Sequence, residues 1–197
     1  MEAAILDYGV GNLYSLASGL RAAGIPARIE ADIGRASKSG CLVLPGVGAF
    51  PVAASRLGPT RQLLRERLDG GLPCLAICLG MQLLFERSAE GVGAGVGLIE
   101  GEVTRLRAAR VPHMGWNAVE SNDPLFSDSQ LHLAYFAHGF ACRPRAEAAV
   151  VGWTGHDGDR FPAAIRWRRT VGVQFHPEKS SDAGIEFLRA FWRGVTA

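Results

Sequence analysis

The chain has 197 residues, of which 48% are hydrophobic and 20% charged, and these proportions exclude intrinsic disorder and fibrous repeats. A chain of this length buries roughly 70% of the surface that it exposes when unfolded, so it needs no disulfide or metal to hold a core. The net charge of +2 is too small to indicate a nucleic acid or an anionic membrane as a partner.

The first half of the chain alternates short apolar runs with helical patterns. Apolar runs at residues 3–6, 41–44 and 73–77 predict buried strands, and the patterns at 13–23, 60–68 and 79–85 predict helices. Continuous apolar strands that alternate with helices predict a parallel sheet covered by helices on both faces.

The second half is rich in strand patterns. Strands are predicted at residues 102–106, 118–121, 131–138, 149–153, 163–167 and 171–175. Asp157-Gly158-Asp159 predicts a hairpin turn, and a final helix is expected over 182–193 with Asp182 as its N-cap. No linker or repeat divides the chain, so we expect one α/β domain, residues 1–197, with an antiparallel portion added to a mostly parallel sheet.

The four cysteines are expected to be reduced thiols. The N-terminus lacks a basic region and a long apolar stretch, so we expect a cytoplasmic protein with no membrane segment. Cys74 and Cys78 have no second pair of ligands at zinc-finger spacing. We therefore expect no metal site.

Cys78 stands where a predicted apolar strand meets a predicted helix. Small residues, Ala76 and Gly80, lie two positions before and after it, which is typical of the sharp turn that exposes a nucleophile. The helix N-terminus favours a thiolate, and the Leu79 N–H could stabilise an oxyanion. The competing interpretation is an inert, buried cysteine.

His176 and Glu178 form a second signal at the end of an apolar strand. Pro177 favours an extended His176, and residues two apart in an extended segment point to the same side. Glu178 could therefore hold one imidazole nitrogen while the other faces a thiol, as in a catalytic triad. Alone, this string would indicate a surface turn; with Cys78 at another strand end, catalysis is favoured.

Pro45-Gly46-Val47-Gly48 follows the strand predicted at 41–44. Its glycines would let the N–H of Gly46 or Val47 supply a second oxyanion donor, and they make reorientation of the loop cheap. The loop matches neither the dinucleotide fingerprint nor the P-loop.

Five segments together resemble the class I (triad) glutamine amidotransferases, and among them the glutaminase subunits of imidazole glycerol phosphate synthases. They are residues 45–50 (PGVGAF), 78–82 (CLGMQ), 111–117 (VPHMGWN), 135–138 (YFAH) and 174–180 (QFHPEKS). The segments occur in family order and extend over essentially the whole chain.

The resemblance implies a flavodoxin-like, three-layer α/β fold and a cofactor-free enzyme that hydrolyses L-glutamine to glutamate and ammonia. By this resemblance Cys78 carries a γ-glutamyl thioester, His176 acts as general base and acid, and Glu178 orients His176. Gly46, Gly80 and Gln82 match positions that hold the glutamine.

The resemblance also implies a heterodimer. The partner would be a cyclase subunit built as a (β/α)8 barrel, which uses the ammonia to make imidazole glycerol phosphate and aminoimidazole carboxamide ribonucleotide in histidine biosynthesis. Asn12, Trp116 and Lys179 match positions that face the cyclase. Because free ammonia is easily lost, we expect the 46–48 loop to complete the oxyanion site only when the partner is engaged.

Two departures from the family pattern leave the triad intact. Gly139-Phe140 stands where the family has a hydroxyl residue followed by Tyr, so glutamine contacts there would come from the backbone, and Ala76 stands where Gly is common. Two alternatives remain open: another class I amidotransferase, serving anthranilate, guanylate or pyridoxal phosphate synthesis, and a non-catalytic α/β domain with a redox-sensing cysteine.

Overall fold

A seven-stranded sheet forms the centre of the computed structural model, which describes residues 1–9 and 12–196. Its strands are β1 (Ala3–Leu6), β2 (Ala27–Glu30), β3 (Cys41–Leu44), β4 (Cys74–Ile77), β11 (Val150–His156), β12 (Asp159–Trp167) and β13 (Thr170–Val173). They lie in the order β11-β12-β13-β4-β3-β1-β2. The pairs from β13 to β2 are parallel, and β11 and β12 continue the sheet antiparallel.

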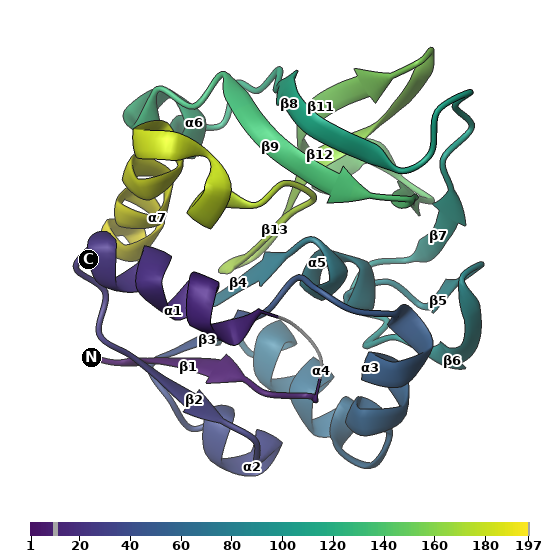
Figure 1. Cartoon of the computed structure of the whole chain (residues 1–197). Helices are drawn as coiled ribbons and strands as arrows, with labels where there is room; N and C mark the ends of the chain where they lie inside the picture. The colour runs from purple at the N-terminus through teal and green to yellow at the C-terminus, as the bar shows by residue number, and fades with distance from the viewer. Residues whose placement is uncertain (10–11, 197) are drawn as a thin grey trace.

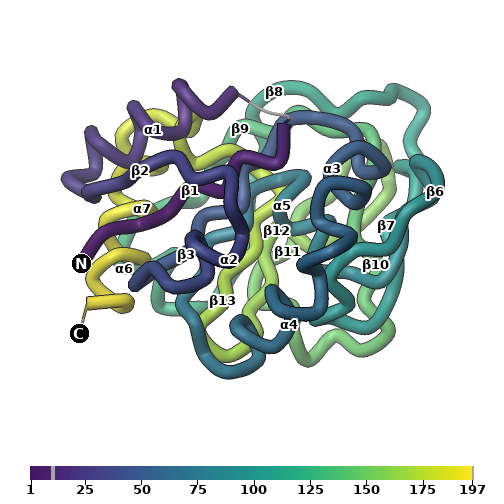
Figure 2. Tube along the Cα trace, turned by 90° about the horizontal axis from the view of Figure 1, so that it is seen from below, coloured from purple at the N-terminus to yellow at the C-terminus, as the bar shows by residue number. Residues whose placement is uncertain are grey.

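Helices cover both faces of this sheet (Figure 1). One apolar core joins it to α1 (Leu13–Ala22), α6 (Pro124–Ser129) and α7 (Ser181–Thr196). A second core joins the opposite face to α2 (Ile33–Ala36), α3 (Phe50–Leu57), α4 (Arg61–Asp69) and α5 (Leu79–Leu83), and Figure 2 shows α2, α3 and α4 on the side of the sheet away from α7. This confirms the predicted three-layer α/β fold with a mostly parallel central sheet.

Two smaller strand groups complete the second half of the chain. One sheet has the order β10-β7-β5-β6 and comprises β5 (Arg87–Ser88), β6 (Gly91–Ala94), β7 (Gly101–Arg105) and β10 (Phe140–Pro144). The other is the antiparallel pair β8 (His113–Ala118) and β9 (Leu133–His138). Short 3-10 turns lie at η1 (Gly58–Thr60), η2 (Glu147–Ala149) and η3 (Pro177–Lys179). Among the described residues, no helix is long and apolar enough to cross a membrane.

The hairpin predicted at Asp157-Gly158 is confirmed. It joins β11 to β12, and both turn residues have positive φ, 48° and 85°, which matches the right-handed twist of the flanking strands.

Other local predictions were wrong. The strand expected at 118–121 lies earlier, as β8, because its alternation of buried and exposed residues starts at His113. Asp182 lies in the first turn of α7 and is not its N-cap, since the helix begins at Ser181. The elements that were not predicted are β2, β5, β6, β10, α2, α3 and α6. Of these, β2 is an edge strand with charged residues and no fully buried position, so its pattern resembles a loop.

Candidate active site

Cys78 lies at the carboxyl end of β4, at the junction with α5. Its φ and ψ are 47° and −103°, a conformation that is strained for any residue with a side chain. The junction is tight because a Cβ on Gly80 would lie 2.3 Å from the Leu44 carbonyl oxygen of β3. The predicted turn is therefore present, and only glycine at position 80 lets α5 start this close to the sheet.

His176 and Glu178 lie beyond the end of β13, the neighbour of β4. His176 is extended (φ −105°, ψ 96°), and its Nδ1 lies 2.9 Å from Oε1 of Glu178, with both side chains at least 95% buried. This is the pairing that the sequence predicted, and it leaves Nε2 of the imidazole for another partner.

Cys78 lines the same cavity as His176 and interacts with its imidazole. Burial alone lowers the pKa of His176, but hydrogen bonding to Cys78 and Glu178 outweighs burial and raises the pKa to about 10. His176 is therefore protonated at neutral pH. The imidazolium therefore places a positive charge in the cavity that Cys78 also lines.

The turn η3 that carries Glu178 lies between two helices that reach it through glycines. A Cβ on Gly19 of α1 would lie 2.7 Å from Cβ of Glu178, and a Cβ on Gly184 of α7 would lie 2.0 Å from the Pro177 carbonyl oxygen. Neither helix could approach this closely with a larger residue. The two glycines thus fix the position of the carboxylate relative to the sheet.

We expect Gly184→Ala to destabilise the fold by about 1–3 kcal/mol, because the added methyl group must displace a backbone carbonyl. Gly194→Ala in the same helix is the matched control. Nothing lies within 4 Å of a Cβ at Gly194, so alanine should stabilise the helix by about 0.5–1 kcal/mol. Urea unfolding measures the change in the free energy of unfolding of each variant relative to the wild type. Equal stabilities of the two variants would contradict the close contact at Gly184.

A cavity of about 320 Å³ opens beside the sulfur. Seven of the residues singled out from the sequence line it: Gly46, Val47, Cys78, Leu79, Gln82, His176 and Lys179. Two others lie behind it, Gly80 against β3 and Glu178 against His176. The remaining lining residues are Gly48, Glu90, Ala137, His138, Gly139 and Phe140.

The glycine loop takes an orientation that the sequence did not reveal. The N–H of Leu79, one of the two expected oxyanion donors, donates a hydrogen bond to the carbonyl of Gly46 over 3.3 Å. In this conformation the loop therefore turns a carbonyl, not an N–H, toward the turn at Cys78. A Cβ on Gly46 would lie 2.7 Å from the Ile77 carbonyl oxygen, so the close approach of loop and turn requires glycine.

Two polar residues of the site were missed. Glu90 brings a carboxylate to the cavity and accepts a hydrogen bond from the N–H of Phe50; the sequence around it offers no signal. Gln174 is fully buried, and its amide nitrogen lies 3.4 Å from Sγ of Cys78. A polar residue within the apolar run before His176 was a usable signal for Gln174, because a buried amide needs hydrogen-bond partners.

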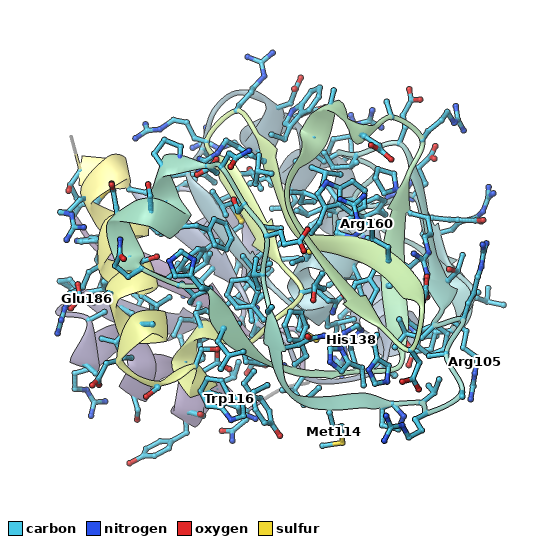
Figure 3. All side chains as sticks on the ribbon, turned by 90° about the horizontal axis from the view of Figure 1, so that it is seen from above. Arg105, Met114, Trp116, His138, Arg160 and Glu186 are labelled. Carbon is cyan, nitrogen blue, oxygen red and sulfur yellow. The ribbon has the colours of Figure 1, made fainter. Side chains whose placement is uncertain are left out.

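The residues expected at a partner interface lie at exposed positions. Asn12 caps α1 by accepting from the N–H of Ser15, and Lys179 lies at the cavity. Trp116 is 50% exposed; together with Met114 it points outward from β8, whereas His138 lies inside the protein (Figure 3). No partner contact is assigned to them by the fold alone.

Comparison with known proteins agrees with this geometry. A family model described as "Glutamine amidotransferase class-I" matches residues 4–194. Imidazole glycerol phosphate synthase subunit HisH of Bacillus subtilis is 39% identical over 95% of this chain and 93% of its own length, and that of Moorella thermoacetica is 44% identical over 95% and 92%.

Solved structures agree in fold. A crystal structure of a glutamine amidotransferase superposes with a TM-score of 0.79 at 17% identity, covering both chains completely. PurLQS from Thermotoga maritima superposes with a TM-score of 0.75 at 18% identity over 98% of each chain. The fold and the sequence relatives together show that this chain belongs to the class I glutamine amidotransferases and, within them, to the HisH family of imidazole glycerol phosphate synthase subunits.

Proposed function

We propose that the protein is the glutaminase subunit of an imidazole glycerol phosphate synthase. It hydrolyses L-glutamine to glutamate and ammonia, and a cyclase subunit uses the ammonia in histidine biosynthesis. One observation carries the chemistry: Cys78 stands on a strained turn in one cavity with His176, whose Nδ1 is held by Glu178. The family to which the chain belongs supports the choice of synthase.

The triad would act in two steps. The Cys78 thiolate attacks the γ-amide carbon, and a C–S bond forms while the oxygen becomes an oxyanion. As the C–N bond breaks, the His176 imidazolium gives its proton to the departing nitrogen, and ammonia leaves. Water then adds to the thioester and gives a proton to His176; the C–S bond breaks, glutamate leaves, and its γ-carboxyl proton passes to solvent.

The cavity offers complementary groups for a free amino acid. We assign the Glu90 carboxylate to the α-ammonium of glutamine, since Glu90 lies in the same cavity as the sulfur and opposite charges attract strongly where water is scarce. Gln82 and the backbone of residues 137–140 would hold the remaining polar groups. The hydroxyl residue that the family has after position 138 is replaced by Gly139, so those contacts fall to peptide groups.

The present conformation of the 46–48 loop would slow glutamine hydrolysis by the isolated subunit. With the Leu79 N–H bonded to the Gly46 carbonyl, the oxyanion lacks its donors until the Gly46–Val47 peptide turns over. Engagement of the cyclase would supply the energy for that change.

We therefore expect glutamine hydrolysis by the isolated chain to be about 10²-fold or more slower than in the complex with a ligand-bound cyclase, the scale of a missing oxyanion donor. The measurement is glutamate release with and without the cyclase. Equal rates would contradict gating by this loop.

We propose a single domain over residues 1–197, since both apolar cores pack on one sheet. Asn12, Trp116 and Lys179 would face the cyclase, a (β/α)8 barrel, and the heterodimer would work in the cytoplasm, where its free thiols stay reduced.

Two assays test the proposed function. The gene should restore growth without histidine to a bacterium that lacks this subunit, and the purified complex should release glutamate from glutamine. Glutamine hydrolysis without restored growth would indicate another class I amidotransferase. Restored growth that survives Cys78→Ala would exclude catalysis by this thiol.

A further inference from the structure

A chain of hydrogen bonds leads from the surface at β8 toward the sulfur of Cys78. The amide nitrogen of Asn117 lies 3.3 Å from Nε2 of His113 and donates to the Gly155 carbonyl over 2.6 Å. Nδ1 of His113 lies 3.2 Å from Nε2 of His138, directly opposite on β9. Nδ1 of His138 in turn lies 2.8 Å from the Phe140 carbonyl oxygen.

The direction of these bonds follows from the groups at their ends. The Phe140 carbonyl only accepts, so Nδ1 of His138 carries the proton and its Nε2 accepts from Nδ1–H of His113. Nε2 of His113 then accepts from the Asn117 amide. Burial lowers the pKa of His138 to about 3 and that of His113 to about 4, so both imidazoles are neutral, as this pattern requires.

The same carbonyl connects the histidines to the nucleophile. It also accepts from Nε2 of Gln82 over 3.1 Å, and this nitrogen lies 3.4 Å from Oε1 of Gln174. Because the oxygen of the Gln174 carboxamide faces a donor, its nitrogen faces Sγ of Cys78 at 3.4 Å. The orientation of the Gln174 amide is thus set by its neighbours.

We infer that Gln174 is a further residue of the catalytic machinery, which stabilises the Cys78 thiolate by donating a hydrogen bond to it. The neutral pair His113–His138 acts indirectly, as positioning residues. Through the Phe140 carbonyl and Gln82, the pair holds the Gln174 amide in the donating orientation. This inference rests on the proposed role of Cys78 as nucleophile.

The physical basis is the charge of the acceptor. An N–H donates a stronger hydrogen bond to an anionic sulfur than to a neutral thiol, so it favours ionisation. Gln174 is fully buried, so water does not compete for its amide. The titratable groups that interact with Cys78 are His176, Tyr8 and Cys142, and the charged groups Glu90 and Lys179 line the same cavity.

The test is the pH dependence of Cys78 alkylation by iodoacetamide in the full chain, followed by mass spectrometry of the Cys78 peptide. This readout needs no glutamine and no cyclase. Gln174→Met keeps the length of the side chain and removes the donor, and it should move the pH midpoint of alkylation upward by about one unit. Gln174→Glu keeps the shape but brings a second negative charge, and it should move the midpoint further.

His138→Phe tests the positioning role. It fills the same space without donating to the Phe140 carbonyl, and it should move the midpoint in the same direction by a smaller amount. His132→Asn, at an exposed position next to β9, is the control and should leave the midpoint unchanged.

An unchanged alkylation midpoint in the folded Gln174 variants would overturn the inference. If only one of the two variants folds, its midpoint alone decides the question. If the alkylation midpoint shifts in the Gln174 variants but not in His138→Phe, the two histidines have no part in positioning the Gln174 amide. If wild-type protein is alkylated as expected but hydrolyses no glutamine with any cyclase, the proposed function fails while the result for Gln174 still stands.

Discussion

Cys78→Ala should lower glutamine hydrolysis by about 10⁴-fold or more, the scale of losing the nucleophile of a triad. The reason is that no other described residue offers a nucleophile at this strained turn between β4 and α5. The measurement is glutamate release by the complex with the cyclase. Gel filtration should show that the variant still forms the complex with the cyclase.

Cys41→Ala is the control for the loss of a thiol. Cys41 is fully buried and lies at the opposite end of a neighbouring strand, so its removal should cost some stability and leave the rate unchanged. If Cys78→Ala hydrolysed glutamine like the wild type, the cysteine would be a structural or redox-sensing thiol, and the proposed mechanism would fail.

Glu178→Gln should lower the hydrolysis rate by about 10²- to 10³-fold. The amide keeps the shape of the carboxylate but no longer stabilises an imidazolium at Nδ1 of His176. The pKa of His176, raised to about 10 with Glu178 in place, should fall in the variant, and NMR titration of the His176 ring measures this shift directly.

The same change should alter how stability depends on pH. The pKa of His176 is raised on folding, so its protonation stabilises the fold fully below its unfolded value near 6.5, and this contribution is lost as the pH rises toward 10. Urea unfolding at pH 6 and pH 10 should show a smaller loss in Glu178→Gln than in the wild type. A mainly structural role for Glu178 would leave the pKa of His176 unchanged.

The turn at Cys78 could be predicted because its information is local. Ala76 and Gly80 flank Cys78 within five residues, and the strain at the cysteine follows from a strand that must turn at once into a helix. Likewise, Pro177 keeps His176 extended, and an extended chain brings Glu178 to the same side. The hydrogen bond between them spans only two residues.

The state of the glycine loop could not be predicted. Gly46 and Gly48 permit several peptide orientations, so the sequence alone does not predict which of them the loop adopts. The choice of a carbonyl facing Leu79 depends on how β3 and β4 lie against each other.

The hydrogen-bond partners of Gln174 could not be predicted from the sequence for a similar reason. Gln174 meets Cys78 across 96 residues, and Gln82 meets the Phe140 carbonyl across 58. These partners come together only through the pairing of β13 with β4 and the packing of β10 near α5. His113 and His138 are 25 residues apart, and only the β8–β9 register places them opposite one another.

The sequence by itself determined the family, the three-layer architecture and the three residues that we propose as the triad, because those features are carried by short strings and by the periodicity of apolar residues. The tertiary structure decided the rest: the blocked Leu79 amide, the carboxylate of Glu90 in the cavity and the donor that faces the sulfur. The physical reason is that hydrogen bonds and close contacts form between groups within a few ångströms in space, and for residues far apart in the chain that proximity is created only when the sheets and helices pack.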